Sequence, residues 1–294
     1  MSDSLYKIGE SYARYSLTDA IYEKIREYLP IDQSTGRPGM DIRLFLDALI
    51  FIAREGCSWR SIPEKYGKWN SIYKKFRLWE SQNVFRKIYL RLIGACDDTA
   101  DDLVLIDRIY YAVSIDSTSA KVHQSAAGAR KDAPEADVKQ HIGTSRGGPN
   151  TKIHALVNED LEMVAVEITG GQVHDSQMAL PLLDTVNIGF IFFHADKAYG
   201  NKEIRQYIQL LNAEMVCPNK SNAKNIYKFD KEQYKGRNVV ERYFQKLKCY
   251  RRIATRYDKL ASVYRSFIYI ASILIKIGNK TREKDLRRMS LSSG

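Results

Sequence analysis

The stretch Tyr234-Lys-Gly-Arg-Asn-Val-Val-Glu-Arg-Tyr-Phe-Gln-Lys-Leu-Lys248 places one carboxylate, that of Glu241, among basic and aromatic residues. Residues spaced three, four and seven apart lie on one face of a helix. Arg237, Glu241 and Lys248 therefore share a side, and Arg252 would follow them. The opposite side is apolar and carries Val240, Tyr243, Phe244 and Leu247. The pattern predicts a helix that packs on a core while its polar face borders a site.

Glu241 also has two simpler explanations. Asn238-Val-Val-Glu241 resembles a capping box, in which the carboxylate would only accept a hydrogen bond from a backbone N–H group. The charged side of an amphipathic helix is also commonly just solvated. Two further carboxylates elsewhere in the chain shift the balance towards a functional site.

Length and charge suggest two domains and a polyanionic partner. The 294 residues are enough for two cores, and 44% of them are hydrophobic, as in a globular protein. Residues 1–96 carry 16 Lys and Arg against 11 Asp and Glu, residues 97–218 carry 10 against 18, and residues 219–294 carry 20 against 6. The basic ends suit a polyanion such as DNA, and the acidic middle suits cations such as metal ions.

The sequence favours an intracellular location. No C-x-x-C pair and no signal peptide is present, so neither a disulfide framework nor a zinc knuckle is indicated. The most apolar run, Phe267 to Ile277, is shorter than the about 20 residues that span a bilayer, and it contains Lys276. We expect a soluble cytoplasmic protein that associates with the nucleoid and not with a membrane.

Residues 1–96 have the periodicity of a helical domain. Helices are predicted from Leu17 to Leu29 and from about Asp41 to Gly56. Residues 58–67 predict a short helix followed by a glycine turn, and the basic run 69–79 predicts a further helix. A short helix, a turn and a basic helix together are the outline of a helix-turn-helix module.

Three cations of this basic run, Lys74, Lys75 and Arg77, would lie outside the core. They could bind phosphates or base edges of DNA. A small helical bundle with a solvated basic face would give the same pattern. DNA binding is favoured because the charge coincides with the helix-turn-helix outline. The acidic segment 97–109 predicts a linker after this domain.

Residues 110–278 change to strand-like alternation interrupted by helical segments. The first strand is predicted around Asp116, and residues 152–157 and 163–168 predict a hairpin. An apolar strand is predicted at residues 189–195, with a helix on either side of it. This order predicts an α/β domain with a mixed sheet flanked by helices.

The C-terminal part predicts one long helix and a tail. Apolar residues at helical spacing run from Leu260 to Ile275, and such a helix should cover the sheet. Residues 279–294 are polar and basic, and we expect them to form a disordered tail.

Three acids lie where a ribonuclease H-like fold could bring them together. Asp116 lies on the first strand, Asp196 follows a later strand, and Glu241 lies on a later helix. Such carboxylates would repel one another and raise each other's pKa unless cations lay among them. Mg²⁺ or Mn²⁺ prefer oxygen ligands, and two such ions about 4 Å apart could activate an attacking hydroxyl and stabilise the leaving oxygen at phosphorus.

The chain resembles the DDE-type bacterial insertion-sequence transposases. Their signature of Tyr, two residues, Arg, three residues, Glu, six residues and Lys is matched by Tyr234, Arg237, Glu241 and Lys248. The segments that resemble other blocks of the family are Ser114–Thr118, Asp196–Tyr199, Gly147–Ala155, Gly171–Ser176, Arg251–Lys259 and, in the helical domain, Cys57–Gly67. Several separated motifs in the right order are more specific than any one alone.

The resemblance implies that Asp116, Asp196 and Glu241 are the catalytic acids and bind two Mg²⁺ or Mn²⁺ ions. It also implies DNA contacts for the basic and aromatic residues on the face of Glu241. These residues are Tyr234, Arg237 and Lys248, and Arg252 is a further candidate because helical spacing would place it on the same face.

Two further residues are candidates for supporting the acids. Tyr199 follows Asp196 closely. His194 precedes it by two residues, and it could orient a carboxylate, contact DNA or be a satisfied core histidine. His174, followed by Asp175, is interpreted as a loop or helix-cap feature.

The same resemblance implies a transposase that binds the terminal inverted repeats of its insertion sequence, cleaves the ends and joins the 3′ hydroxyls to target DNA. The expected partner is double-stranded DNA, and a homodimer is the default expectation because two ends must be brought together. Two alternatives stay open, a metal-dependent nuclease without strand transfer and a non-enzymatic DNA-binding regulator. A complete set of three acids argues against the regulator.

Overall fold

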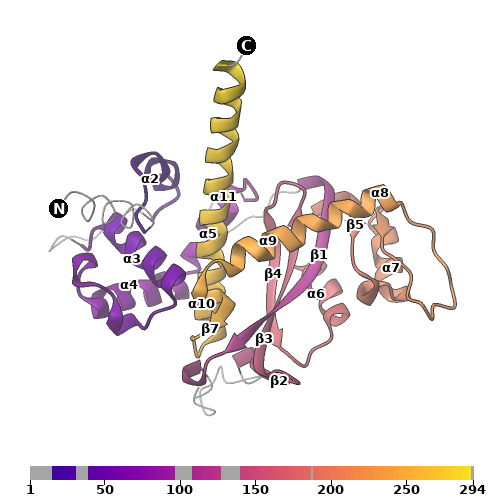
Figure 1. The fold of residues 1–294 in the computed structure, drawn as a ribbon, viewed down its shortest axis with the longest axis horizontal. Helices are drawn as coiled ribbons and strands as arrows, with labels where there is room; N and C mark the ends of the chain where they lie inside the picture. The colour runs from indigo at the N-terminus through magenta and orange to yellow at the C-terminus, as the bar shows by residue number, and fades with distance from the viewer. Residues whose placement is uncertain (1–14, 31–38, 97–107, 127–139, 187, 293–294) are drawn as a thin grey trace, which may run out of the picture. The chain divides into compact units, whose positions relative to one another are not determined.

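The chain forms two compact units in a computed structural model, which describes residues 15–30, 39–96, 108–126, 140–186 and 188–292 (Figure 1). The helical unit comprises residues 1–94, 249–254 and 262–294. The sheet unit comprises residues 95–248 and 255–261. Most of the predicted linker 97–109 lies outside the described residues.

The helical unit contains the predicted N-terminal helices. Thr18 caps α2 (Asp19–Arg26), and Asp41 caps α3 (Ile42–Glu55), where its side chain accepts a hydrogen bond from the Leu44 amide at 3.2 Å. Gly56 ends α3 in the left-handed conformation, with φ of 65°, which glycine adopts without steric cost. The unit continues with α4 (Trp69–Ser81), α5 (Val84–Leu92) and α10 (Arg251–Ala254).

The segment before α4 differs from the predicted short helix. It forms two 3-10 turns, η1 (Trp59–Ser61) and η2 (Glu64–Tyr66), because Pro63 and Gly67 interrupt helical hydrogen bonding. The helix that precedes the turn is therefore α3 and not residues 58–67.

The longest helix, α11 (Ala261–Ser292), belongs to the helical unit from Ser262 onward. Its Phe267 ring stacks on Phe76 with centroids 5.2 Å apart, so α11 completes an aromatic core there. The sequence predicted that this helix would cover the sheet, and it predicted a disordered tail at residues 279–294. In the structure this segment belongs to the helical unit instead. Helix α11 continues to Ser292, so most of the predicted tail is helical (Figure 1).

Part of α11 also has the composition of a membrane span. Residues Ala261–Gly278 are long and apolar enough to cross a bilayer, which makes the stretch longer than the run Phe267–Ile277 noted in the sequence. However, 67% of the stretch is buried inside the structure, as in the core helix of a folded unit.

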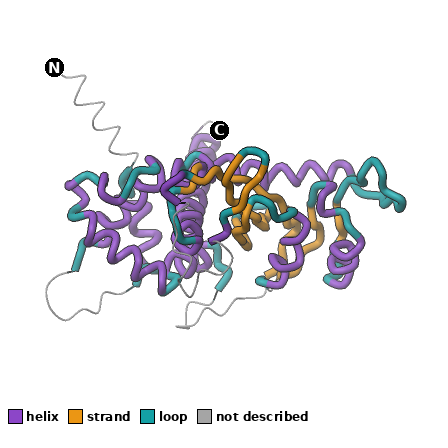
Figure 2. Tube along the Cα trace, turned by 90° about the horizontal axis from the view of Figure 1, so that it is seen from below, coloured by secondary structure: helices purple, strands orange, loops and turns teal. Residues whose placement is uncertain are grey.

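The sheet unit is built on one mixed sheet of seven strands (Figure 2, strands in orange). Its main path is β2-β3-β1-β5-β6, with β4 paired to β3 and β7 paired to β1. Strand β1 pairs antiparallel with β3 and parallel with β5 and β7. The strands are β1 (Arg108–Val122), β2 (Gly143–Ser145), β3 (Gly148–Asn158), β4 (Met163–Gly170), β5 (Ile188–His194), β6 (Glu214–Val216) and β7 (Thr255–Arg256).

Helices cover this sheet on both faces. On one face, Val113 and Ile115 of β1 pack in a buried cluster with residues of α6 (Ala179–Asp184) and α7 (Lys202–Leu210). On the other, α9 (Asn238–Lys248) crosses β1 and β3 (Figure 1). Because successive side chains of a strand point to opposite faces, Ser114 and Asp116 lie on the α9 side.

Candidate active site

Strands β1 and β5 place two of the three predicted acids next to each other. Ser114 pairs in parallel register with His194, and each of the two acids lies two residues further along its strand direction. Asp116 is still within β1, whereas Asp196 has just left β5 and caps the 3-10 turn η6 (Lys197–Tyr199). Its Oδ1 accepts a hydrogen bond from the Ala198 amide at 2.7 Å.

The third acid comes from a helix that starts earlier than expected. Asp230 caps α8 (Lys231–Tyr234), which continues through the 3-10 turn η7 (Lys235–Arg237) into α9. Asn238 is itself helical, with φ of −56° and ψ of −17°, so no helix begins there. The capping-box explanation of Glu241 is therefore wrong, because the N–H group that it would bind belongs to a continuing helical segment.

Arg237 connects the helix to the strand. Its Nη2 donates to Oδ2 of Asp116 at 2.7 Å, and its Nη1 donates to Oε1 of Glu241 at 2.5 Å. The Arg237 side chain is 16% exposed, against 20% for Asp116 and 46% for Glu241. A largely buried cation thus bridges two of the acids, which makes these charge-assisted contacts stronger than surface pairs.

Asp116 has an unusual ionisation. Burial raises the pKa of its carboxyl group, and the negative charges of Asp196 and Glu241 raise it further. The Ser117 amide, which donates to Oδ1 at 2.8 Å, and the charge of Arg237 oppose this shift in pKa. The three carboxylates therefore give the site a negative charge that Arg237 offsets only in part.

The donor set suits a divalent cation. Within the described residues, no three His, Cys, Asp or Glu side chains are close enough together to hold one ion. The guanidinium of Arg237 instead lies between carboxylates of Asp116 and Glu241, so these oxygens already enclose a positive charge. All three acids offer the hard oxygen ligands that Mg²⁺ and Mn²⁺ prefer.

Tyr199 belongs to the buried cluster that α6 and α7 form with β1, and it is 1% exposed. Burial raises the pKa of its hydroxyl strongly, and the charges of Asp116, Asp175 and Asp196 contribute to the rise. The hydroxyl is buried and forms no hydrogen bond with the described residues. Tyr199 therefore remains neutral and keeps a donor available close to the acids.

His194 is a buried core residue, but it is not the satisfied core histidine considered among its roles, because its Nε2 is buried and forms no hydrogen bond with the described residues. It is 2% exposed, and its Nδ1 lies 3.3 Å from Oγ of Ser114. Burial lowers its pKa, so the ring is neutral. A Cβ on Gly236 would come within 2.7 Å of its Cε1 atom, which shows how closely η7 packs on this ring.

The predicted DNA contacts separate into two groups. Tyr234 and Arg237 lie beside the acids, and Lys248 is exposed at the end of α9. Arg252 is 3% exposed in the helical unit, where its Nη1 donates to the Cys57 carbonyl at 2.7 Å. Its guanidinium also lies over the rings of two aromatic residues, Trp59 and Phe267. The prediction that Arg252 contacts DNA is wrong, because α9 ends at Lys248 and the helical spacing does not extend to Arg252.

The three cations predicted on α4 also differ from one another. Lys74 is exposed. Lys75 lies over the rings of Phe45 and Trp79, and Arg77 forms an ion pair with Glu80 at 2.9 Å. Lys74 is thus the one best exposed to meet a phosphate.

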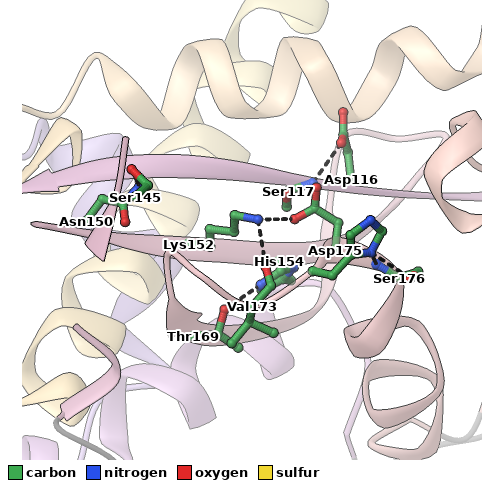
Figure 3. A network of polar contacts seen from close by, with 11 residues as sticks. Asp116, Ser117, Ser145, Asn150, Lys152, His154, Thr169, Val173, Asp175 and Ser176 are labelled. Atoms are coloured by element: carbon green, nitrogen blue, oxygen red, sulfur yellow. Dashed lines mark hydrogen bonds and ion pairs between the residues drawn. The ribbon is translucent and has the colours of Figure 1, made fainter. Parts of the chain in front are cut away.

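Sequence reasoning missed a polar network next to Asp116 (Figure 3). Lys152 on β3 donates to Asp175 Oδ1 at 2.9 Å and to the Val173 carbonyl at 2.7 Å. Asp175 opens the 3-10 turn η5 (Asp175–Met178), and His174 caps this turn as the sequence predicted. The available signal was that Lys152 and Asp175 both lie in blocks that resemble the transposase family.

Comparison with known families assigns both parts of the chain. Residues 107–275 match the model of the "Transposase DDE domain", which is more than half of the chain. Residues 17–89 match the model described as "Putative transposase of IS4/5 family (DUF4096)".

Two relatives match over shorter stretches. A protein of Brucella ovis, named "Putative transposase for insertion sequence element IS6501", is 32% identical over 130 residues, which is 42% of this chain and 96% of the relative. "Uncharacterized protein y4sN" of Sinorhizobium fredii is 33% identical over 116 residues, which is 39% of this chain and 83% of the relative.

Solved transposase structures are more distant. The piggyBac transposase synaptic complex with hairpin DNA is 11% identical with a TM-score of 0.49, covering 92% of this chain and 75% of that chain. The Mos1 paired-end complex is 10% identical with a TM-score of 0.25, covering 74% of this chain and 81% of that chain. On the two family models and the relative from Brucella ovis, the chain belongs to the DDE transposases and is an enzyme of that family.

Proposed function

We propose that this chain binds the terminal inverted repeats of its insertion sequence, cleaves the ends by metal-dependent phosphodiester hydrolysis and joins the freed 3′ hydroxyls to target DNA. The observation that carries this proposal is that Arg237 pairs with both Asp116 and Glu241, while the parallel register of β1 and β5 places Asp196 beside Asp116. Two acids held by backbone amides and a third on a helix form a site of fixed shape and high negative charge.

The acids would hold two Mg²⁺ or Mn²⁺ ions. Bound ions of this kind activate a water or a 3′ hydroxyl for attack and stabilise the departing oxygen. Backbone amide groups of the chain would hold the acids in position for these ions. Asp116 is oriented by the Ser117 amide and Asp196 by the Ala198 amide. Glu241, the most exposed of the three, lies on the side from which a substrate would approach.

Arg237 has two tasks in this proposal. Without DNA it forms ion pairs with Asp116 and Glu241 and offsets part of their negative charge. When DNA is bound, its planar guanidinium is suited to grip a phosphate in a bidentate manner. Lys248 and Tyr234 would follow the strand on either side of the reacting bond. These roles agree with the motif spacing that first pointed to the site.

The partner in this proposal is double-stranded DNA, both at the element ends and at the target. A homodimer would bring two ends together, and counting chains per pair of ends by mass photometry would test this stoichiometry. The place of action would be the nucleoid in the cytoplasm, where element ends and target DNA lie.

The test is cleavage of DNA that carries the chain's own element end, in Mg²⁺, by wild type and by Asp116→Asn, Asp196→Asn and Glu241→Gln. Each variant should lose cleavage by a factor on the order of 10³ or more while still binding the end, because the three acids act as a unit. The matched control is Glu203→Gln, an exposed acid on α7, which should cut normally.

The outcomes separate the alternatives. Cleavage without joined products would show a nuclease. Specific binding by a wild-type chain that never cuts would show a regulator. Near-normal cleavage by any of the three acid variants would remove that residue from the site.

A further inference from the structure

The loop that follows β4 is fastened to the sheet by one lysine. Lys152 projects from β3 and contacts this loop at two points, the Val173 carbonyl at 2.7 Å and Asp175 Oδ1 at 2.9 Å (Figure 3). The side chains of Lys152 and Asp175 are only 18% and 32% exposed. A pair this shielded from water has a fixed geometry, unlike an ordinary surface ion pair.

Asp175 is linked in turn to the strand that carries Asp116. Its carboxylate points towards Ser117 (Figure 3), and hydrogen bonding with the Ser117 side chain helps to lower the pKa of Asp175. Burial would raise the pKa of Asp175, but the hydrogen bonds from Lys152 and Ser117 outweigh this effect and lower it. Asp175 is therefore a carboxylate and not a neutral acid when it accepts from Ser117.

Ser117 connects the two faces of β1. Its side chain lies on the face of Asp175, because neighbouring residues of a strand point to opposite sides. Its backbone amide donates to Oδ1 of Asp116 at 2.8 Å. The contacts thus run from Lys152 through Asp175 and Ser117 to Asp116, and Figure 3 shows Asp116 and Asp175 on opposite sides of the strand.

The surroundings of Tyr199 also link Asp175 to the predicted acids. The buried hydroxyl of Tyr199 experiences the charges of three carboxylates, those of Asp116, Asp175 and Asp196. This hydroxyl forms no hydrogen bond with the described residues. Asp175 therefore shares with Asp116 and Asp196 an electrostatic effect on one buried hydroxyl.

We propose that Asp175, held by Lys152, is a positioning residue for Asp116, which it orients through Ser117. The proposal rests on the proposed function, because it gives Asp175 a role in holding a metal-binding carboxylate. Residues that hydrogen-bond to the support of a metal ligand typically change metal affinity or activity by about 10- to 100-fold when removed. A purely structural pair would change stability and leave metal affinity alone.

Two variants separate these roles. Asp175→Ala removes the carboxylate and leaves Lys152 without an anionic partner in a shielded place, where only the Val173 carbonyl still accepts from it. Ser117→Ala keeps the Lys152–Asp175 pair and the loop attachment, and it removes only the side-chain link. Ser117→Thr retains a hydroxyl and serves as the conservative rescue. The matched control is Glu232→Gln, which breaks an ion pair of the same unit with Lys235 that is 73% and 78% exposed.

The measurement is Mn²⁺ affinity by calorimetry on the full chain without DNA, together with the Mg²⁺ concentration that gives half-maximal cleavage. Hydrogen exchange of β3 and β4 monitors folding. We expect Asp175→Ala to weaken Mn²⁺ binding by about tenfold and Ser117→Ala to weaken it in the same direction. Ser117→Thr and Glu232→Gln should behave like wild type.

Contrary results are distinguishable. Wild-type Mn²⁺ affinity in Ser117→Ala would overturn the positioning role, even if Asp175→Ala unfolds. A wild-type chain that neither binds Mn²⁺ nor cuts DNA would overturn the proposed function, and this role with it.

Discussion

Nη2 of Arg237 lies 2.7 Å from Oδ2 of Asp116, although 121 residues separate them in sequence. The contact places a permanent cation where a divalent metal ion is expected to bind, and Nη1 of the same group holds Glu241. Arginine remains charged at any relevant pH, so metal entry requires its side chain to move and not to lose a proton. In the proposed function, Arg237 and a divalent cation would therefore compete for the same carboxylates.

This competition predicts the effect of Arg237→Gln. The variant removes both ion pairs of Arg237, and if their competition with the metal amounts to about 1 kcal/mol, Mn²⁺ binding without DNA should tighten by roughly fivefold. The same variant should cut DNA poorly, because it loses the phosphate grip. Calorimetric titration beside a cleavage assay measures both effects. Arg242→Gln removes one charge from the exposed face of α9 and should change Mn²⁺ affinity less. Weaker Mn²⁺ binding by Arg237→Gln would mean that the arginine supports the site and does not compete for it.

His154 predicts how the sheet unit responds to acid. The residue is fully buried on β3, where its Nε2 lies 2.8 Å from Oγ1 of Thr169 and its Nδ1 forms no hydrogen bond with the described residues. Burial lowers its pKa to about 4. Between the unfolded pKa of about 6.5 and this value, only the unfolded chain binds the proton. Acid therefore favours unfolding, by about 3 kcal/mol over that range.

His154→Gln should remove this loss, because glutamine does not titrate. The measurement is hydrogen exchange of β1 and β3 peptides at pH 6.5 and pH 4.5, since all three tryptophans lie in the helical unit and fluorescence would not report on the sheet. An equal loss of protection in both proteins would show that another group carries the acid response.

The sequence predicted those features whose residues lie close together both in the fold and along the chain. Helix α9 and its acid were predicted because helical spacing operates over one short segment. Strands β1 and β5 were predicted from their side-chain patterns, and the family motifs marked Asp116 on β1 and Asp196 just after β5. In each case the information lies within about ten residues.

The sequence did not predict where a helix ends or which residues distant in the chain form contacts. Arg252 lies four residues after Lys248, which is helical spacing, but α9 ends at Lys248. Arg252 therefore belongs to α10 in the helical unit. Lys152 and Asp175 are 23 residues apart, on a strand and on a 3-10 turn, and no local period links them. The assignment of α11 depended likewise on which apolar partners were available, and the helical unit supplied Phe76 for Phe267.

Arg252→Ala should destabilise the helical unit and not specifically weaken DNA binding. The substitution removes a charged hydrogen bond to the Cys57 carbonyl and a cation–π contact with Phe267, whose centroid is 4.5 Å away. Together these interactions are worth about 3 kcal/mol. Urea unfolding followed by tryptophan fluorescence measures the loss directly, because Trp59 lies against the same guanidinium.

Lys74→Ala is the matched comparison for Arg252→Ala. Lys74 is exposed on α4, so its removal should leave the urea midpoint unchanged and weaken binding to an element end. Unchanged stability in Arg252→Ala with reduced DNA affinity would restore Arg252 as a DNA contact.

The last prediction concerns the close approach of Gly236 to His194. A methyl group at Gly236 would lie 2.7 Å from Cε1 of a ring that is itself 2% exposed, so either this ring or the turn η7 that carries Gly236 must shift, and we expect η7 to move. Arg237 is the next residue, and a shift of this kind would move its guanidinium away from Asp116 and Glu241. We expect Gly236→Ala to lower the cleavage rate by about 100-fold, which is the effect that a misplacement of about 1 Å can have. Replacing His194 by alanine creates space for the methyl group, so the Gly236→Ala/His194→Ala pair should recover part of the rate relative to Gly236→Ala alone. A double-mutant cycle on cleavage rates, with hydrogen exchange of α9 as the folding control, measures this coupling. Additive losses in the double variant would show that Gly236 does not act by providing space for the His194 ring.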